Sequence, residues 1–192
     1  MIVTSKVFRI ATETHFDGFL SPFGFTRTKS EDEEFGFSVT YRCGERYVSI
    51  GATLHPHDYP YYLWLNLGDG RDDFPESDWN ATALWRFVQH LSPDDYAKEK
   101  DLYDISMGLT ESDVEEKMRC LRISCEAFGQ SFLSGDLAMF KKLRAAQNRD
   151  REPYKIYSPK QGGGYEMSYE EGSSRLKKKF SDEAPNPWWK LW

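Results

Sequence analysis

The sequence predicts an α+β fold, in which an antiparallel meander of about four strands is covered on one face by an N-terminal helix and by later helices. Two observations lead to this class. Segments in which apolar and polar residues alternate are confined to the first part of the chain, and segments with helical spacing dominate the part that follows. Strands and helices that are segregated in this way do not build the parallel sheet of alternating βαβ units.

The segments on either side of Gly44-Glu45 predict a β-hairpin and its register. A two-residue loop at this dipeptide pairs Tyr41 with Val48 and Val39 with Ile50. It also gives two outer apolar pairs, Phe37 with Ala52 and Phe35 with Leu54. Every apolar side chain then shares one face, whereas a slip of one residue would scatter them. A hairpin with one apolar face belongs to an antiparallel sheet that needs a cover.

A helix at the N-terminus and two more strands are expected around this hairpin. Thr4 or Ser5 can cap a helix that runs to about Leu20, and a polar strand is expected near residues 25–31. The apolar stripe of the helix comprises Phe8, Ala11, His15, Phe16, Phe19 and Leu20. Residues 61–67 alternate again, with Tyr61, Leu63, Leu65 and Leu67 on one face and Tyr62, Trp64 and Asn66 on the other.

Capping residues and apolar spacing predict the later helices. Asp78 can cap a helix, and Ser92-Pro93 starts a short helical piece. Thr110 with Asp113 resembles a capping box and opens an amphipathic helix of about six turns that Gly135 ends. The buried residues expected in these helices are Leu84, Phe87, Val88 and Leu91 in the first and Val114, Met118, Leu121, Cys125, Phe128 and Phe132 in the long one; Leu137, Phe140 and Leu143 indicate one more helix.

The composition changes after Arg149. Residues 1–149 are expected to form the α+β domain, and residues 150–192, which are rich in Gly, Ser, Pro and charge, an extended C-terminal tail. The tail ends with Trp188, Trp189 and Trp192. Because exposed tryptophans favour aggregation, we expect these three to dock as an aromatic anchor, either on this domain or on a partner, while part of 158–184 stays comparatively loose.

The net charge of −6 is distributed unevenly along the chain. Residues 58–116 carry 4 basic and 15 acidic side chains, whereas residues 117–192 carry 15 basic and 9 acidic ones. An acidic middle repels nucleic acid and attracts basic surfaces. The alternative is that the two regions partly neutralise each other in the fold. The basic run Lys177-Lys178-Lys179 is a weak signal for nucleic acid, and no base-reading motif accompanies it.

Several features predict a cytoplasmic protein. No apolar run approaches the roughly 20 residues of a membrane span, and the N-terminus carries charge where a signal peptide needs an uninterrupted apolar segment. Cys43, Cys120 and Cys125 form neither a metal-binding spacing nor an even disulfide framework. Reduced thiols in the cytoplasm are the simplest interpretation.

The segment His55-Pro56-His57-Asp58 is the densest set of groups that could do chemistry. Two imidazoles and a carboxylate can hold a divalent metal. The prolines constrain this loop, however, and the helical His-Glu-x-x-His spacing is absent. The acidic segment Asp69-Gly70-Arg71-Asp72-Asp73 does not have the ligand spacing of an EF-hand calcium loop. A solvated turn is the simpler interpretation. We therefore expect no catalytic residue, no metal and no cofactor.

Three features favour recognition of another protein. The second face of the sheet offers small polar residues around Tyr62 and Trp64, a flat surface that can bind a partner or receive a helix. A group of acidic residues that follows can steer a basic partner: Asp69, Asp72, Asp73, Glu76 and Asp78. The third feature is the tail with Trp188, Trp189 and Trp192, since Trp is strongly enriched at interface hot spots.

The layout resembles small uncharacterised bacterial α+β proteins, including immunity-type proteins of polymorphic toxin systems. The similar elements are an opening helix that leads to Gly24-Phe25, an aromatic meander, and a late helix that ends Phe132-Leu133-Ser134-Gly135-Asp136, with Leu137 and Phe140 beyond it. The resemblance covers about residues 5–145 and none of the tail. It implies a cytosolic protein that binds and blocks or regulates another protein without an active site, and it transfers no functional residue.

The first hypothesis is thus a non-enzymatic, immunity-like protein-binding module that acts on a partner with a basic surface, without membrane or nucleic-acid binding. A small metal- or acid/base-dependent enzyme that uses His55, His57 and Asp58 is one alternative. A structural subunit whose tail ties it into a larger assembly is the other. The oligomeric state stays open.

Overall fold

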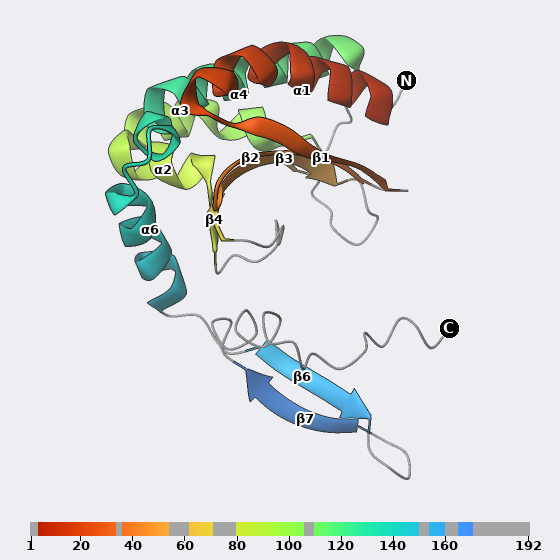
Figure 1. Cartoon of the computed structure of the whole chain (residues 1–192), viewed down its shortest axis with the longest axis vertical. Helices are drawn as coiled ribbons and strands as arrows, with labels where there is room; N and C mark the ends of the chain where they lie inside the picture. Colours follow the sequence, from red (N-terminus) through yellow and green to blue (C-terminus); the bar gives the residue numbers. More distant parts are fainter. Residues whose placement is uncertain are drawn as a thin grey trace. The chain divides into compact units, whose positions relative to one another are not determined.

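The computed structural model describes residues 4–33, 36–53, 62–70, 80–105, 110–149, 154–159 and 165–170. The chain divides into two compact units, Met1–Ala145 and Ala146–Trp192. The first unit is an α+β domain in which helices lie over one face of an antiparallel sheet (Figure 1). The predicted fold class is therefore confirmed.

The sheet contains five strands in sequential order, each antiparallel to its neighbours. They are β1 (Thr26–Glu33), β2 (Gly36–Cys43), β3 (Arg46–Thr53), β4 (Leu63–Asp69) and β5 (Ala81–Ala83). The sequence predicted about four, because β5 has three residues and no alternation that could announce it. Among the described residues, β1 and β5 are the edges of the sheet.

The hairpin of β2 and β3 has the predicted register. Val39 pairs with Ile50 and Tyr41 with Val48, and Phe37 pairs with Ala52. The turn lies at Gly44, whose φ of 61° is a conformation that glycine adopts without strain. The outermost predicted pair, Phe35 with Leu54, lies outside the described residues.

Helix α1 (Ser5–Leu20) covers the apolar face of the sheet together with α4 (Glu111–Phe128) (Figure 1). Thr4 caps α1 as predicted, since its side chain accepts a hydrogen bond from the Val7 N–H. The predicted capping box of Thr110 and Asp113 opens α4. The two helices meet where His15 Nε2 lies 2.6 Å from Glu115 Oε1. His15 is thus a hydrogen-bonded boundary residue, as its place on the helix suggests.

The core is continuous between the sheet and its covering helices. Its central residues on the strands, Val39, Ile50 and Leu65, are almost completely buried. The helices add the following fully buried side chains: Phe8, Phe16 and Leu20 from α1, Phe87 and Val88 from α2 (Leu84–Leu91), and Met118 and Leu121 from α4. Of the predicted apolar face of residues 61–67, Leu63, Leu65 and Leu67 are buried as predicted, and Tyr61 lies outside the described residues.

Two of the predicted helices differ from those observed. The helix expected after Asp78 begins at Leu84, because residues 81–83 add β5 to the sheet instead. Leu91, at the last position of α2, is 48% exposed and is not a core residue. The long helix ends at Phe128, and α5 (Gln130–Leu133) continues its apolar spacing after Gly129. The remaining helices are α3 (Pro93–Tyr103) and α6 (Ala138–Arg149), with a short 3-10 helix, η1, at Ser21–Phe23.

The second unit contains an antiparallel hairpin of β6 (Tyr154–Pro159) and β7 (Tyr165–Glu170). Ile156 pairs with Ser168 and Tyr157 with Met167. The sequence predicts an extended C-terminal tail over residues 150–192, and the structure adds the paired strands β6 and β7 within that range.

Candidate functional site

Three of the predicted partner-binding residues, Tyr62, Trp64 and Asp69, belong to the described part of the chain. The structure places all three on or beside β4. The remaining predicted residues lie outside the described ranges: Asp72, Asp73, Glu76, Asp78, Trp188, Trp189 and Trp192, and likewise His55, His57 and Asp58 of the enzyme alternative.

Trp64 lies on the face of the sheet that is turned away from α1, as predicted. Its indole ring lies across Gly51 on β3, where a Cβ atom would be 2.3 Å from the Trp64 Cζ2 atom. The ring is half-buried, and its Nε1 atom is buried with no hydrogen-bond partner among the described residues. Trp64 thus packs onto the sheet and offers a partner only part of its surface.

The rest of this second face is less open than the sequence suggested. Tyr47 and Ser49 are fully buried, and Thr40 is 4% exposed. The Tyr47 ring lies across Gly68 of β4, and its hydroxyl donates to Asn80 Oδ1 at 3.1 Å. The centre of the predicted flat binding surface is therefore packed and buried.

Asp69 lies near a basic side chain of the same domain. It is half-buried, and its carboxylate is close enough to the Arg144 guanidinium of α6 to interact with it. Burial lowers the pKa of Arg144, and Asp69 partly opposes this change. A carboxylate in this position is less able to steer a distant partner than a free one, because the nearby guanidinium offsets its field.

In the described part of the acidic middle, carboxylates reach the surface along α3 and in the first turns of α4, where Glu111, Asp113, Glu115 and Glu116 are exposed. Asp94, Asp101 and Asp104 are exposed, and Asp95 is half-buried. Asp95 accepts hydrogen bonds from Ser92 Oγ at 2.6 Å and from Lys98 Nζ at 3.2 Å, and these bonds lower the pKa of its carboxyl group. The Asp95 carboxylate therefore carries a negative charge at neutral pH.

Aromatic side chains lie at both ends of this acidic helix. At its start, the Trp85 ring of α2 packs against Tyr96 with ring centroids 5.8 Å apart, and the Arg86 guanidinium lies 4.4 Å from the Trp85 ring centroid. At its end, Tyr62 forms an antiparallel bridge with Asp104 and is 49% exposed. We call the surface formed by Asp94, Asp95, Asp101 and Asp104 with Trp85, Arg86, Tyr96 and Tyr62 the α3 surface.

The α3 surface is held rigidly against α4. Lys117 Nζ donates to three carbonyl oxygens at the end of α3, those of Asp101 at 3.1 Å, Leu102 at 2.8 Å and Asp104 at 3.0 Å. Ser124 Oγ donates to Glu99 Oε2 at 3.0 Å. A cation on the last carbonyls satisfies groups that every helix leaves unpaired. The acidic side chains are thus presented from a fixed backbone.

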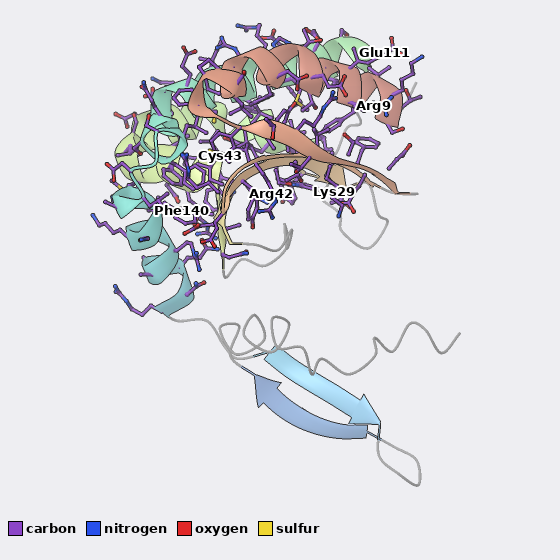
Figure 2. All side chains as sticks on the ribbon, viewed as in Figure 1. Arg9, Lys29, Arg42, Cys43, Glu111 and Phe140 are labelled. Carbon is purple, nitrogen blue, oxygen red and sulfur yellow. The ribbon has the colours of Figure 1, made fainter. Side chains whose placement is uncertain are left out.

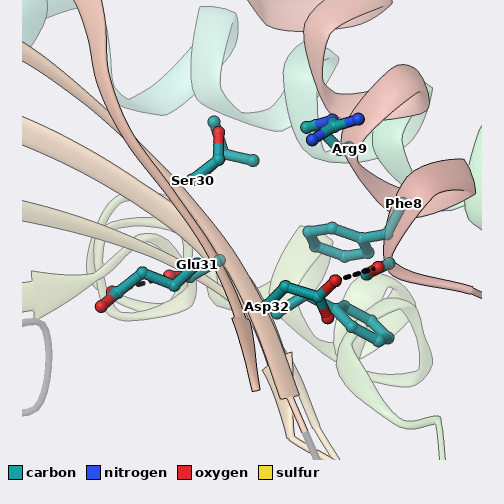
Figure 3. Close-up of a pocket in the computed structure, with 9 residues that line it drawn as sticks. Phe8, Arg9, Ser30, Glu31 and Asp32 are labelled. Atoms are coloured by element: carbon teal, nitrogen blue, oxygen red, sulfur yellow. Dashed lines mark hydrogen bonds between the residues drawn. The ribbon is translucent and has the colours of Figure 1, made fainter. Parts of the chain in front are cut away.

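A small pocket lies between α1 and the sheet edge (Figure 3). Phe8, Phe37 and Val39 form its apolar part, and Ser5 Oγ donates to Asp32 Oδ2 at 2.6 Å at its rim. Its volume of about 40 Å³ holds a few water molecules, whereas ligand pockets usually measure roughly 300–1,000 Å³. This pocket is too small to bind a metabolite.

Reactive groups are scarce in the described ranges. No group of three or more potential metal ligands comes together there. Burial raises the pKa of the Cys125 thiol to about 12, and burial together with Glu116 raises that of Cys120, so neither is an activated nucleophile. None of the helices in these ranges combines the length and apolar character that crossing a bilayer requires.

The sequence did not single out Trp85, Arg86 and Tyr96, whose side chains the structure brings together at the surface. Trp85 and Tyr96 belong to different helices, and only the turn at Ser92 brings their rings together. A clue was available, because Trp85 falls beside the apolar stripe of Leu84, Phe87 and Val88. Comparisons with protein-family models, with curated proteins and with solved structures find no match to this chain.

Proposed function

We propose that this protein is a non-enzymatic binding module that blocks or regulates a partner protein, and that the partner presents a basic surface to the α3 surface. One observation carries the proposal. Exposed carboxylates on α3 lie between aromatic side chains at both ends of the helix, and Lys117 fixes the backbone that presents them.

The charges of the α3 surface support a basic partner. Asp94 and Asp101 are exposed, one near each end of the helix. Carboxylates grouped in this way raise the rate at which a basic protein associates, and salt screens the effect. Charges at the edge of an interface act more on the association rate than on the lifetime of the complex.

The aromatic residues supply the apolar anchors that charge alone does not provide. Trp, Tyr and Arg are the residue types most enriched at hot spots, and Trp85, Tyr96 and Arg86 represent all three within one stacked group. Trp85 and Tyr96 are half-buried, so that ordering them on binding costs less entropy than ordering free side chains.

The proposal also agrees with the likeness to immunity-type proteins, which would make the partner a toxin that this protein blocks in the cytoplasm. A cytoplasmic location is supported by the three cysteines, Cys43, Cys120 and Cys125, all of which are free thiols.

Site-specific photo-crosslinking tests where the partner binds. A photoreactive amino acid replaces Tyr96 in one variant and Ile123 in another, because Ile123 is an exposed apolar residue on the outer side of α4. In cells of the source organism, the position-96 variant is expected to give a discrete cross-linked product that the position-123 variant lacks. Equal products at both positions, or none at position 96, would remove the α3 surface from the interface.

The partner obtained in this way then allows a kinetic test. The double variant Asp94→Asn/Asp101→Asn is expected to associate several-fold more slowly at low salt and to show a weaker dependence on salt, with its fold unchanged. The matched control is Glu111→Gln/Glu126→Gln, which removes the same charge from exposed positions of α4. Association rates that respond equally to both double variants would mean that net charge matters and that the α3 surface does not.

A further inference from the structure

The free edge of the sheet is the second surface of interest. In the described part of the chain, β1 pairs with β2 alone. Thr26 to Ser30 and Asp32 are exposed along it. An edge strand presents alternate N–H and C=O groups that have no partner, and another strand can pair with them.

The charges on β1 change sign at its middle. Arg27 and Lys29 precede Ser30, and Glu31 and Asp32 follow it. Two identical strands that pair antiparallel run in opposite directions, so the basic part of one meets the acidic part of the other. We infer that a second copy of this chain pairs with β1 across a two-fold axis at Ser30, which joins the two sheets edge to edge.

The position of the two-fold axis at Ser30 is set by two charged side chains, Lys29 and Glu31, which lie on the same face of β1. Lys29 pairs with Thr40 and Glu31 with Ser38 on β2, so both point to the face opposite α1. Figure 2 shows Lys29 there, and Figure 3 shows Glu31 on the side of β1 opposite Ser30 and Asp32. With this axis, Lys29 lies across from Glu31 of the second copy, and the reverse pair forms by symmetry.

Neighbouring registers are less favourable. An axis at Glu31 sets the two Glu31 side chains opposite each other, and an axis at Lys29 does the same for the two lysines. Opposite charges directly across a strand pair favour pairing, and like charges disfavour it. The side chains of Lys29 and Glu31 are 42% and 34% exposed, and Lys29 Nζ lies 2.6 Å from Glu31 Oε1 within one copy, so the dimer would extend this ion pair into an alternating group of four charges.

The same edge carries features that limit pairing to one partner. The register shifts between Arg27 and Lys29, and Thr28 Oγ1 donates to the Thr40 carbonyl at 3.3 Å. The bulge interrupts regular pairing before Lys29 and so confines the regular edge of β1 to the residues that follow it. The other edge of the sheet, β5, has three residues. A two-fold pairing therefore uses the only long edge in the described sheet and closes the assembly at a dimer.

Charge reversal tests this pairing without a known ligand. The oligomeric state is measured by sedimentation velocity over a concentration series at low salt, with circular dichroism to check the fold. The wild-type chain is expected to dimerise, and the single variants Lys29→Glu and Glu31→Lys are each expected to be monomeric. An equimolar mixture of the two variants is expected to form a heterodimer, and the double exchange Lys29→Glu/Glu31→Lys to restore the homodimer.

The control variant is Lys98→Glu, which makes the same charge change at a 75% exposed side chain on α3 and is expected to dimerise like the wild type. A wild-type chain that stays monomeric at every concentration would overturn the proposal. Single variants that dimerise as well as the wild type, or a mixture that stays monomeric, would overturn it equally. These outcomes leave the proposed function of the α3 surface untouched, because none of its residues is changed.

Discussion

The indole ring of Trp64 occupies the space that a side chain at Gly51 would need. A Cβ atom at Gly51 would lie 2.3 Å from Trp64 Cζ2 and 2.8 Å from the Phe37 carbonyl oxygen. Aromatic side chains that cover a glycine on the neighbouring strand compensate for the weak strand propensity of that glycine. The stability of the sheet at this point therefore depends on Trp64 and Gly51 together.

Gly51→Ala is expected to destabilise the domain by about 1–3 kcal/mol, since overpacking forces the ring and the strands apart. Chemical denaturation measures the effect. The matched control is Gly18→Ala, which adds the same methyl group to a helix where nothing lies within 4 Å, and which is expected to be neutral or slightly stabilising. Trp64→Leu combined with Gly51→Ala should recover part of the loss. Equal stability of the two alanine variants would show that the ring does not lie over Gly51.

Val39→Asp is expected to unfold the domain. Val39 is 1% exposed and pairs with Ile50 in the core, so the new carboxylate would be buried without a partner at a cost of several kcal/mol. That cost is comparable to the whole stability of a domain. Ile10→Asp, at a 48% exposed position on α1, is the control and is expected to keep its thermal melting temperature. A Val39→Asp protein that melts like the wild type would contradict the observed register.

The free energy of unfolding is expected to fall as the pH rises above 9. Burial raises the pKa of Cys125 from 9.0 to about 12, and it raises the pKa of Tyr41 and Tyr103 far above 10.0. The unfolded chain releases these protons at their ordinary values while the folded protein retains them. The stabilisation that these groups contribute is therefore complete below pH 9. Above that pH, the free energy of unfolding falls by up to about 1.4 kcal/mol per pH unit for each group.

Urea unfolding at a series of alkaline pH values measures this slope. Lys117 acts in the opposite direction, because burial lowers its pKa and the folded state releases that proton first. Tyr41→Phe removes one titrating group and is expected to give a shallower slope above pH 10. Its control is Tyr62→Phe, which removes a phenol at a position that is 49% exposed. A slope of zero in the wild-type protein would show that these groups are not buried in their protonated forms.

Lys117→Met is expected to destabilise the domain by about 1.5–3 kcal/mol and to increase amide exchange at the end of α3. The change removes a charged donor from three carbonyl oxygens and leaves them without this partner. Lys98→Met is the control, because Lys98 is 75% exposed and its ion pair with Asp95 is a surface pair of small value. Two variants of equal stability would remove the capping role of Lys117.

The parts of the fold that the sequence predicts are those with a strict period and a definite turn. Residues 37–52 alternate without interruption around Gly44-Glu45, and register and buried face follow directly. The capping box at Thr110 is equally local. By contrast, β5 shows no alternation of apolar and polar residues, and it forms because its backbone pairs with β4. The end of α4 at Phe128 was missed because the apolar spacing continues through Gly129 into α5.

The candidate site was less predictable than the fold. The acidic character of the middle of the chain could be read from the composition, but its place on the surface could not. Asp69 was predicted as a steering charge, and it lies beside Arg144 of α6, which is distant in the sequence. Trp85 and Tyr96 were not selected, because their stacking depends on the angle between α2 and α3, which no local pattern encodes.

The order of the elements along the chain has a consequence while the protein is being made. The last strand of the sheet ends at Ala83, whereas α4 ends at Phe128 and contributes Val114, Met118 and Leu121 to the core. At about 5–20 residues per second, a ribosome needs about 2–9 s to synthesise the intervening residues. During that interval, the part of the sheet that α4 later covers is not yet shielded by that helix. The nascent chain then exposes more apolar surface than the finished domain, and α1, already synthesised, is the element that shields the earliest strands.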